Sequence, residues 1–429
     1  MSTKTGQPWG TPQGSLWAAT AAPAPETQPL QGPVHVDVAV IGAGVFGLSL
    51  ALHLAQRGCH VVVLERGAIG DGASGRNGGL VVPSLPRLMP ADVRRVYGAA
   101  AGDRLAHLVG SGGSLIWSLI AQHQIACDAS ATGWINPAHR PSRLPAVAER
   151  VRQWQALGQP VALWDGDQTA ATIGSRQFAG ALFDPTGGHL NPLSYVRGLA
   201  RAAMAAGVEI APATEVTTVL RQDSRWHLAT PRGTVQADRV VWATNAASGP
   251  GVMATVPLLV HQMATQPLPA SVRARVLVGS PSLSDTRNNL FSARWTADGR
   301  LGTGGMASWQ PAAAAPRLAR RLARRLEVQL DLTPNSLTME YAWTGIAALT
   351  PGLVPRLAEV APGVLVPLAC NGRGLCLATA LGAALAAWLA TNGTPPIPLT
   401  PLKDIPHHWL ARLLPRLLLP LGDWQDGRG

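Results

Sequence analysis

Lysine is almost missing from this chain, since only Lys4 and Lys403 occur among its 429 residues. The formal net charge of +11 therefore comes almost entirely from arginine, and the arginines are scattered along the chain. A nucleic-acid-binding surface needs positive charge that is clustered on one face. The one dense run, "RLARRLARR" (317–325), has helical spacing, which favours a solvated helix face. The charge alone therefore predicts no nucleic-acid partner.

Cysteine is also scarce, and Cys59, Cys127, Cys370 and Cys376 form no C-x-x-C pair. This spacing excludes a disulfide framework and indicates a reducing compartment. The first residues lack the apolar core of a secretory signal. The longest apolar run, at 375–390, is shorter than the roughly 18 residues that indicate a membrane span. We expect a cytoplasmic protein in which this run forms a buried helix.

The length of the chain exceeds what one hydrophobic core usually supports, so two domains are expected. The valine-rich run 36–44 and the run 60–65 predict buried strands, and the stretch 45–58 between them has helical periodicity. Together they form a β-α-β unit. Rossmann-like segments recur in three separated blocks, so one domain is interrupted by another. The proline-rich residues 1–33 predict a non-helical arm.

The stretch "GAGVFG" places Gly42, Gly44 and Gly47 between the first strand and its helix, and Glu65 ends the next strand. In this context G-x-G-x-x-G is a dinucleotide-binding fingerprint. The first glycine makes a tight turn, the second lets a pyrophosphate approach, and the third allows close packing of helix and strand. Glu65 is suited to accept both ribose hydroxyls, which disfavours NADP. An ordinary β-α-β unit without a nucleotide is the alternative.

The acid is followed by "RGAIGDGASGRNGGLV", a long loop of small residues (66–81). Such a bare backbone suits a planar ring that comes very close. The sequence here resembles the D-amino-acid-oxidase (DAO) superfamily of FAD-dependent enzymes, and most closely its γ-glutamylputrescine-oxidase-like branch. In that branch "GASGRNGG" lines the flavin. The resemblance extends over nearly the whole chain, through the ordered blocks "SLWAAT", "CDASATGWINPAH", "GGHLNPLSYVRGLARAA", "ATNA", "MATQPLP", "DTRNNLFSARWTADGRLGTGG", "YAWTGIAALTPGLVPRL" and "CNGRGLCLATALG".

The resemblance implies which residues contact FAD: Gly42, Gly44, Val45, Phe46, Gly47, Glu65, Arg66, Ala73, Ser74, Arg76, Asn77, Gly78, Gly79, Leu80, Val216, Ala243, Thr244, Gly372, Arg373, Gly374 and Leu375. The start of the long apolar helix would also place positive charge near the reduced flavin. One departure is Gly352, where the family usually has an acidic residue. Non-covalent FAD is expected, because relatives attach the flavin through a cysteine whose place here is near Gly345, or through a histidine in the loop that here holds Arg76 and Asn77, and neither nucleophile is present.

Catalytic groups are harder to predict, because the flavin itself carries out the hydride transfer and the protein positions the substrate. The chain shows no Ser-His-Asp set, no paired carboxylates and no spacing typical of metal ligands, so no metal is expected. His189 is a candidate for touching the substrate or flavin, and Arg294 a candidate for binding a substrate carboxylate. A satisfied turn histidine and a surface strand residue are the alternatives for the two.

The resemblance implies an α/β (α+β) protein with a Rossmann-like FAD-binding domain, interrupted by a substrate domain that has helices and a mainly antiparallel sheet. We expect an N-terminal arm at 1–33, an FAD-binding domain at 34–83, 186–251 and 345–395, a substrate domain at 84–185 and 252–344, and a tail at 396–429. The tail segment "HHWLARLLPRLLLPL" (407–421) favours packing against the protein over peripheral membrane contact, because Pro415 interrupts any long helix.

The predicted function is oxidation of the C–N bond of an amine or amino acid, such as a secondary amine, a polyamine derivative or a D-amino acid. Electrons would pass to O₂ or to a quinone or protein acceptor. Relatives of the sarcosine-oxidase type place a lysine above the flavin to help reduce O₂, and the matching stretch 299–305 contains none. The alternatives are an oxidase that modifies the wobble uridine of tRNA, and a flavin-binding protein without turnover.

Overall fold

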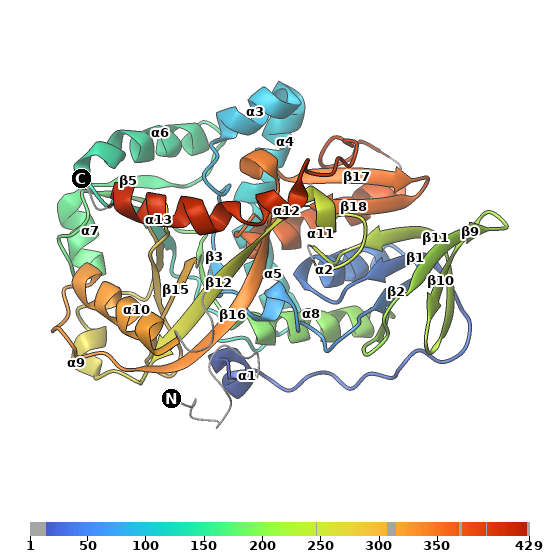
Figure 1. The fold of residues 1–429 in the computed structure, drawn as a ribbon, viewed down its shortest axis with the longest axis horizontal. Helices are drawn as coiled ribbons and strands as arrows, with labels where there is room; N and C mark the ends of the chain where they lie inside the picture. Colours follow the sequence, from blue (N-terminus) through green and yellow to red (C-terminus); the bar gives the residue numbers. More distant parts are fainter. Residues whose placement is uncertain (1–13, 246, 307–314, 369–370, 392, 427–429) are drawn as a thin grey trace.

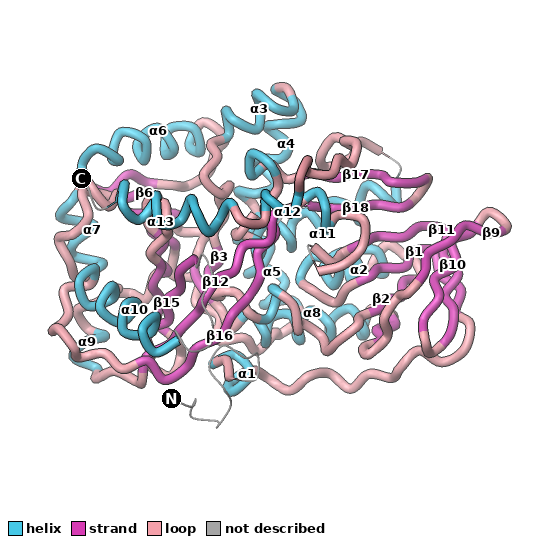
Figure 2. Tube along the Cα trace, viewed as in Figure 1, coloured by secondary structure: helices cyan, strands magenta, loops and turns pink. Residues whose placement is uncertain are grey.

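The computed structural model describes residues 14–245, 247–306, 315–368, 371–391 and 393–426, and shows two eight-stranded sheets side by side (Figure 1). All the predicted FAD-contacting residues lie within these ranges, whereas Lys4 and Cys370 lie outside them. The strands of both sheets are flanked by helices, as the magenta and cyan segments of Figure 2 show. The mixed α/β fold class predicted from the sequence is confirmed.

The first sheet has a parallel core, in which β1 pairs with β2 and β11, β2 with β8, and β11 with β18. Strands buried on both faces need continuous apolar runs, which β1 and β2 have in "VAVI" and "VVVL". β17, β10 and β9 add antiparallel pairs. The strands are β1 (Val34–Ile41), β2 (Val61–Leu64), β8 (Glu209–Ala211), β9 (Thr218–Gln222), β10 (Arg225–Thr230), β11 (Gly233–Trp242), β17 (Arg356–Ala361) and β18 (Val364–Leu368).

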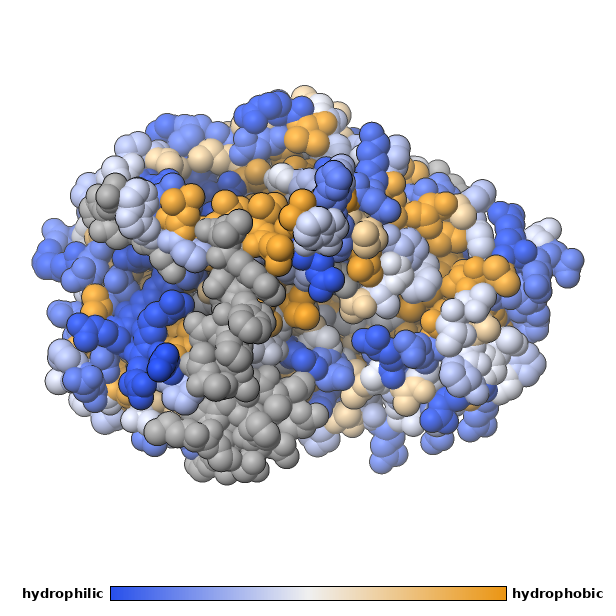
Figure 3. All heavy atoms as spheres, viewed as in Figure 1, coloured by the Kyte–Doolittle hydropathy of each residue, from blue (hydrophilic) through white to orange (hydrophobic). Residues whose placement is uncertain are grey.

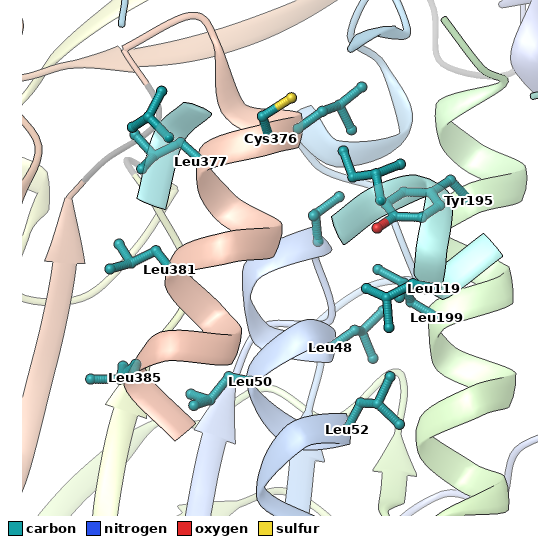
Figure 4. Packing of buried hydrophobic residues seen from close by; sticks show 14 of the residues in the cluster. Leu48, Leu50, Leu52, Leu119, Tyr195, Leu199, Cys376, Leu377, Leu381 and Leu385 are labelled. Carbon is teal, nitrogen blue, oxygen red and sulfur yellow. The ribbon is translucent and has the colours of Figure 1, made fainter. Parts of the chain in front are cut away.

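Three helices cover one face of this sheet: α2 (Val45–Ala55), α8 (Pro192–Ala205) and α11 (Gly374–Thr391). Figure 4 shows α2 between the other two helices, with Leu50 on its side toward α11 and Leu48 and Leu52 on its side toward Leu199 of α8. By length and composition α11 qualifies as a membrane span, but 56% of it is buried inside the protein. A core helix of a soluble protein passes the same test. The expectation of a buried helix at 375–390 is therefore confirmed.

The second sheet is mainly antiparallel and has the order β16-β12-β15-β14-β13-β4-β6-β5. Only β13 and β4 pair in parallel. One face packs on α10 (Ala315–Gln329), whose Leu318, Leu322 and Leu326 belong to a second hydrophobic core. The strands are β4 (Trp134–Pro137), β5 (Ala162–Trp164), β6 (Ala181–Asp184), β12 (Val256–Thr265), β13 (Ser282–Ser284), β14 (Ser292–Trp295), β15 (Leu301–Met306) and β16 (Met339–Leu349).

The chain passes repeatedly between the two sheets. Strands of the first sheet come from 34–64, 209–242 and 356–368, and those of the second from 134–184, 256–306 and 339–349. A small ladder of β3 (Leu80–Val81) and β7 (Gly188–His189) lies apart from both sheets. The helices of the intervening segments are α3 (Pro90–Tyr97), α4 (Ala99–Gly110), α5 (Gly112–Gln122), α6 (Leu144–Gln155), α7 (Gly166–Ile173) and α9 (Ala270–Arg273). The domain limits given above stay predictions.

The N-terminal arm contains a short helix, α1 (Leu16–Thr20), so the prediction of a wholly non-helical arm is wrong. Ser15 caps this helix by accepting a hydrogen bond from the backbone N–H of Ala18. Leu16 and Trp17 are buried against residues of β12, β16 and α8. Tertiary packing on a part of the chain far away in sequence thus stabilises a helix that is too short to persist alone.

The C-terminal tail forms α12 (His408–Ala411) and α13 (Leu414–Asp426), which run across the second sheet in Figure 1. Polar contacts fasten both ends. His408 Nε2 lies 2.8 Å from the carbonyl oxygen of Thr255, and Asp426 Oδ2 accepts the Asn288 N–H at 2.6 Å. The two helices are separate on either side of residues 412–413.

Candidate functional site

Gly42, Gly44 and Gly47 form the tight turn between β1 and α2. A Cβ on Gly47 would lie 2.1 Å from the carbonyl oxygen of Gly42. A Cβ on Gly42 would lie 2.9 Å from the carbonyl oxygen of Ala243, and Gly42 has a φ of +115°. Side chains at these positions would push helix and strand apart. The turn therefore has the close packing that the dinucleotide fingerprint requires.

Glu65 follows β2 and turns its carboxylate back to this glycine turn. Its Oε2 accepts the Ala43 N–H and its Oε1 the Gly67 N–H, both at 2.8 Å. An ionised carboxylate has about four acceptor positions, so a partly exposed Glu65 can also receive ribose hydroxyls. The neighbouring Arg66 points to solvent, where its Nη1 lies 3.9 Å from Glu215 Oε1.

The glycine-rich loop closes over the start of α2. Its residues Ala73–Gly75 form a single 3₁₀ turn, and Ser74 Oγ accepts the Val45 N–H at 3.0 Å. Asn77 folds the rest of the loop, because its side chain accepts the Gly79 N–H and donates to the carbonyl oxygen of Ser74. Arg76 pairs with Asp71 at 2.9 Å. Leu80 begins β3 directly after the loop.

The predicted cofactor segments meet at one edge of the first sheet. The parallel strands β1, β2, β11 and β18 end at Ile41, Leu64, Trp242 and Leu368, and each predicted segment follows one of these ends or packs on it. Ala243 N donates to the carbonyl oxygen of Ile41 at 2.8 Å. The carboxyl edge of a parallel sheet is where such folds bind nucleotides. Residues 42–47, 65–66, 73–80 and 243–244 are therefore brought together.

Two further predicted segments reach the same edge. The backbone of Thr214 donates to the carbonyl oxygen of Glu65 at 2.8 Å, which places partly buried Val216 nearby. After β18, Asn371 accepts the Thr350 N–H at 2.8 Å, and Gly372 has a φ of +79°. The 18-residue helix α11 then begins at Gly374. A helix start carries about half a positive charge, which fits an electron-rich ring.

Arg373 lies between that turn and the second sheet. Its Cζ is 4.9 Å from the ring of Trp134, a fully buried residue of β4. Its Nη1 is inaccessible to solvent and has no hydrogen-bond partner among the residues that the structure describes. Burial lowers the pKa of Arg373 to about 9, and the charges of Arg150 and Arg87 act in the same direction. A guanidinium in this setting is suited to an anion.

One face of the second sheet is turned to the glycine-rich loop. Ser292, Gly304, Gln262 and Trp343 lie opposite one another on four adjacent strands, so their side chains share a face. Trp343 Nε1 donates to the carbonyl oxygen of Arg76 at 2.9 Å, which shows that this face is turned to the loop. The side chain of Gln262 lies between sheet and loop, because a Cβ on Gly304 would lie 2.5 Å from its Nε2 and a Cβ on Gly78 would lie 3.2 Å from its Oε1.

Sequence reasoning missed this sheet face. The available signal was the run "GTGG", whose alternate residues Gly302 and Gly304 fall on one face of a strand. Its meaning depends on Gln262 and Ser292, which the strand pairing places beside it.

His189 and Arg294, the two candidate catalytic residues, contact each other behind the loop. Arg294 Nη1 lies 3.1 Å from His189 Nδ1, and Arg294 Nε donates to the carbonyl oxygen of Gly78 at 2.8 Å. His189 Nε2 lies 3.0 Å from the carbonyl oxygen of Ser280. Burial, followed by the charge of Arg294, lowers the pKa of His189 to about 3. Both ring nitrogens are engaged within the protein, which favours a positioning role; direct catalytic roles stay predictions.

Arg294 also stacks on the N-terminal arm, with its Cζ 4.5 Å from the Trp17 ring. Trp17 Nε1 in turn donates to the carbonyl oxygen of Asn77 at 2.8 Å. A cavity of about 100 Å³ next to Arg294 is lined in part by Asp128 and Asp298. Two carboxylates in its wall make this cavity a poor site for an anionic substrate. Arm, arginine and loop form one packed unit.

Arg300 is the cation in the stretch where oxygen-reactive relatives carry lysine. Its Nε donates to Asp298 Oδ2 at 2.6 Å, and its Nη1 contacts the carboxylate of Glu340. The guanidinium also lies 5.1 Å from the ring of Tyr341. Its charge is therefore neutralised within the protein. In the described parts of the chain no group of three or more His, Cys, Asp or Glu is placed to hold a metal ion.

Replacement of Glu65 by alanine is expected to weaken FAD binding by about 1.5–3 kcal/mol, the range for a hydrogen bond to a charged group. The measurement is the dissociation constant from titration of apoprotein with FAD, followed by flavin fluorescence. Glu215→Ala removes an exposed carboxylate close to the same edge and serves as the control. Equal affinities of the two variants would refute the ribose assignment.

Comparison with known families gives a match over residues 37–388 to the family DAO, described as FAD dependent oxidoreductase. Gamma-glutamylputrescine oxidoreductase of Escherichia coli K12 is 29% identical over 367 residues, covering 84% of this chain and 85% of that protein.

The crystal structure of glycine oxidase from Geobacillus kaustophilus superposes with a TM-score of 0.70 at 21% identity, covering 87% of this chain and 99% of that one. The tRNA 5-methylaminomethyl-2-thiouridine biosynthesis bifunctional protein MnmC of Shewanella amazonensis is 30% identical over 244 residues, which cover 54% of this chain but 33% of that protein.

Proposed function

This chain belongs to the DAO family of FAD-dependent oxidoreductases, which act on amines or amino acids, and from this premise we propose that it oxidises the C–N bond of its substrate. The proposed substrate carries a carboxylate and is a secondary amine, a polyamine derivative or an amino acid. The amine loses a hydride from the carbon next to nitrogen and a proton from nitrogen. The resulting imine is then hydrolysed by water. The observation that carries this proposal is the meeting of the predicted cofactor segments at the carboxyl edge of the first sheet, with the second sheet turned to the glycine-rich loop.

The residues fit FAD, because glycines form the cradle and Glu65 faces it. When bound, FAD would supply the two-electron acceptor for the hydride. The turn at Gly42–Gly47 would hold the pyrophosphate and Glu65 the adenosine ribose. The loop at Asn77–Gly79 and the sheet face at Gly304 would enclose the reacting carbon and exclude bulk water.

Arg373 is the residue that we assign to the substrate carboxylate. It approaches the carboxyl edge of the first sheet from the start of α11, and its buried Nη1 has no partner among the described residues. A planar carboxylate matches the guanidinium fork in geometry and charge. Arg150, whose Nη1 lies 3.4 Å from Asn136 Oδ1, adds positive charge beside β4, the strand that carries Trp134. Plain polyamines, which carry only positive charge, would be poor substrates.

The flavin is proposed to be held without a covalent bond. Gly345 lies near the place at which sarcosine-oxidase-type relatives carry a cysteine, and a Cβ there would lie 3.4 Å from the Cβ of Arg76. Neither residue offers a nucleophile. Acid precipitation of the yellow protein should therefore release intact FAD into the supernatant.

An anaerobic screen tests the function. Amines and amino acids are added in pairs that differ only in a carboxylate, and the visible absorbance of the oxidised flavin is followed. The carboxylated member should bleach the flavin and the other should not, and Arg373→Gln should raise the half-saturating concentration at least tenfold with unchanged FAD content. Loss of FAD instead would assign Arg373 to the cofactor.

The alternatives predict different outcomes of this screen. A protein that binds flavin without turnover would be bleached by dithionite but by no amine. A tRNA-modifying oxidase would bind heparin tightly, and its affinity for heparin would fall steeply as the salt concentration rises. The match to the bifunctional tRNA enzyme covers 33% of that protein, so it supports the shared family and leaves the tRNA activity as the weaker candidate.

A further inference from the structure

The C-terminal helices expose a stripe of large apolar side chains. On α13, Leu414, Leu418, Leu421 and Trp424 recur with the spacing of one helix face, and all four are exposed. Trp409 and Leu410 on α12 extend the stripe, with Trp409 66% exposed. We name these six residues the C-terminal apolar stripe. Figure 3 shows an orange band where Figure 1 places α12 and α13.

The polar anchors of these helices hold the apolar side chains outward. The body of the protein contacts α12 through His408 and Ala411, which are buried. It contacts α13 through Gly422, which packs against Asn288, and through Asp426. A surface helix normally turns its leucines to the protein, whereas Leu414, Leu418 and Leu421 are exposed. Contiguous exposed apolar side chains mark an interaction surface rather than ordinary surface variation.

A row of arginines lies next to this stripe. Arg317, Arg320, Arg321 and Arg324 are exposed on one face of α10, while its leucines pack on the second sheet. Helices α10 and α13 both contact the segment 288–289. Arg325 of α10 donates to the carbonyl oxygen of Asn289 at 2.5 Å, and Asp426 of α13 accepts the N–H of Asn288. Figures 1 and 3 place both helices on the same side of the molecule.

We propose that this side of the protein, made of the C-terminal apolar stripe and the arginines of α10, binds the surface of an anionic lipid membrane. Leucine and tryptophan side chains enter the boundary between headgroups and acyl chains, as interfacial helices do. The arginines bind anionic headgroups. This interaction needs neither substrate nor flavin, so it stands or falls separately from the proposed catalytic activity.

The chemistry of the surface favours lipid over two other occupants. A nucleic acid would pair with the arginines but would leave two tryptophans and four leucines unused. A second copy of this chain would cover the leucines but would bring two arginine rows of like charge together. A membrane with anionic lipids satisfies both halves of the surface. It also brings the enzyme to quinones, which dissolve in the lipid phase.

Vesicle flotation with the purified holoenzyme tests the proposal. Wild-type protein should float with vesicles that contain phosphatidylglycerol and phosphatidylcholine, and much less with phosphatidylcholine alone. The double variant Leu418→Gln/Leu421→Gln should lower the partition coefficient at least tenfold on both kinds of vesicle. The double variant Arg320→Gln/Arg324→Gln should weaken binding to the anionic vesicles alone, by about fivefold for each arginine removed.

Matched controls carry the same substitutions elsewhere. Leu220→Gln on β9 and Arg104→Gln on α4 change one exposed leucine and one exposed arginine outside this surface, and both should float like wild type. FAD content should be the same in all variants. The proposal is overturned if wild type floats with neither vesicle, or if the stripe variants float normally. It is also overturned if light scattering shows a dimer that the leucine variant dissociates, or if tRNA binds through the arginines with the leucines unneeded.

Discussion

Gly47→Ala is expected to yield protein with at most one tenth of the wild-type FAD content. The new Cβ would lie 2.1 Å from the carbonyl oxygen of Gly42, which is backbone and cannot rotate away, and 3.2 Å from side-chain atoms of Ala243 and Val40. The helix must therefore move off the strand, and overpacking of this kind costs about 1–3 kcal/mol or more. Because the start of α2 is the proposed pyrophosphate site, the displacement also removes the binding geometry.

Gly72→Ala is the control, because this glycine directly precedes the 3₁₀ turn Ala73–Gly75 and a Cβ there would meet nothing within 4 Å. Its φ of −78° is also one that alanine adopts easily. FAD released by acid, per mole of chain, and the thermal unfolding midpoint of each variant are the measurements. If Gly47→Ala retains FAD as well as Gly72→Ala does, the glycine turn is not the pyrophosphate site.

The reduced enzyme is expected to react with O₂ more slowly, by a factor on the order of a hundred or more, than relatives with a lysine above the flavin. An unpaired charge about 4 Å from a developing anion contributes about 4 kcal/mol at an effective dielectric constant of 20, and each 1.4 kcal/mol is about tenfold in rate. Arg300, in the corresponding stretch, is already paired with Asp298 and Glu340. Lys403 is an exposed residue of the tail.

Stopped-flow reoxidation measures this expectation. Enzyme reduced by an anaerobic substrate, or by dithionite if none is found, is mixed with O₂ or with a soluble quinone, and the return of the flavin absorbance gives both rate constants. A quinone rate constant well above the O₂ value supports a dehydrogenase. A rate constant with O₂ that equals that of lysine-bearing relatives would show that another group supplies the charge.

The parts of the site that lie close together in sequence were predictable. Gly42, Gly47 and Glu65 belong to one β-α-β unit, and each residue type is dictated by a backbone or charge requirement of that unit. The loop at 72–79 was recognisable for the same reason, since its composition rules out a core. These segments do meet at the carboxyl edge of the first sheet.

What escaped prediction depends on pairings between distant segments. Arg294 contacts His189 across 105 residues of sequence, and Trp17 donates to Asn77 across 60. The helix at Leu16–Thr20 exists only because its leucine and tryptophan find a pocket made by β12, β16 and α8. Composition and periodicity describe one segment at a time, so they cannot report which second segment will cover it.

Trp17 stacks on Arg294 and donates a hydrogen bond to the carbonyl oxygen of Asn77, and these contacts constrain the order in which the enzyme folds during synthesis. The arm is the first part of the described chain to be made, yet it can dock only after residue 294 and the strand that carries Trp343 have followed. The helix start at Gly374 comes later still. A ribosome-bound chain that ends before that helix should therefore hold the glycine turn and Glu65 but capture no flavin. FAD would therefore bind in the last stage of folding and would not direct the first stage.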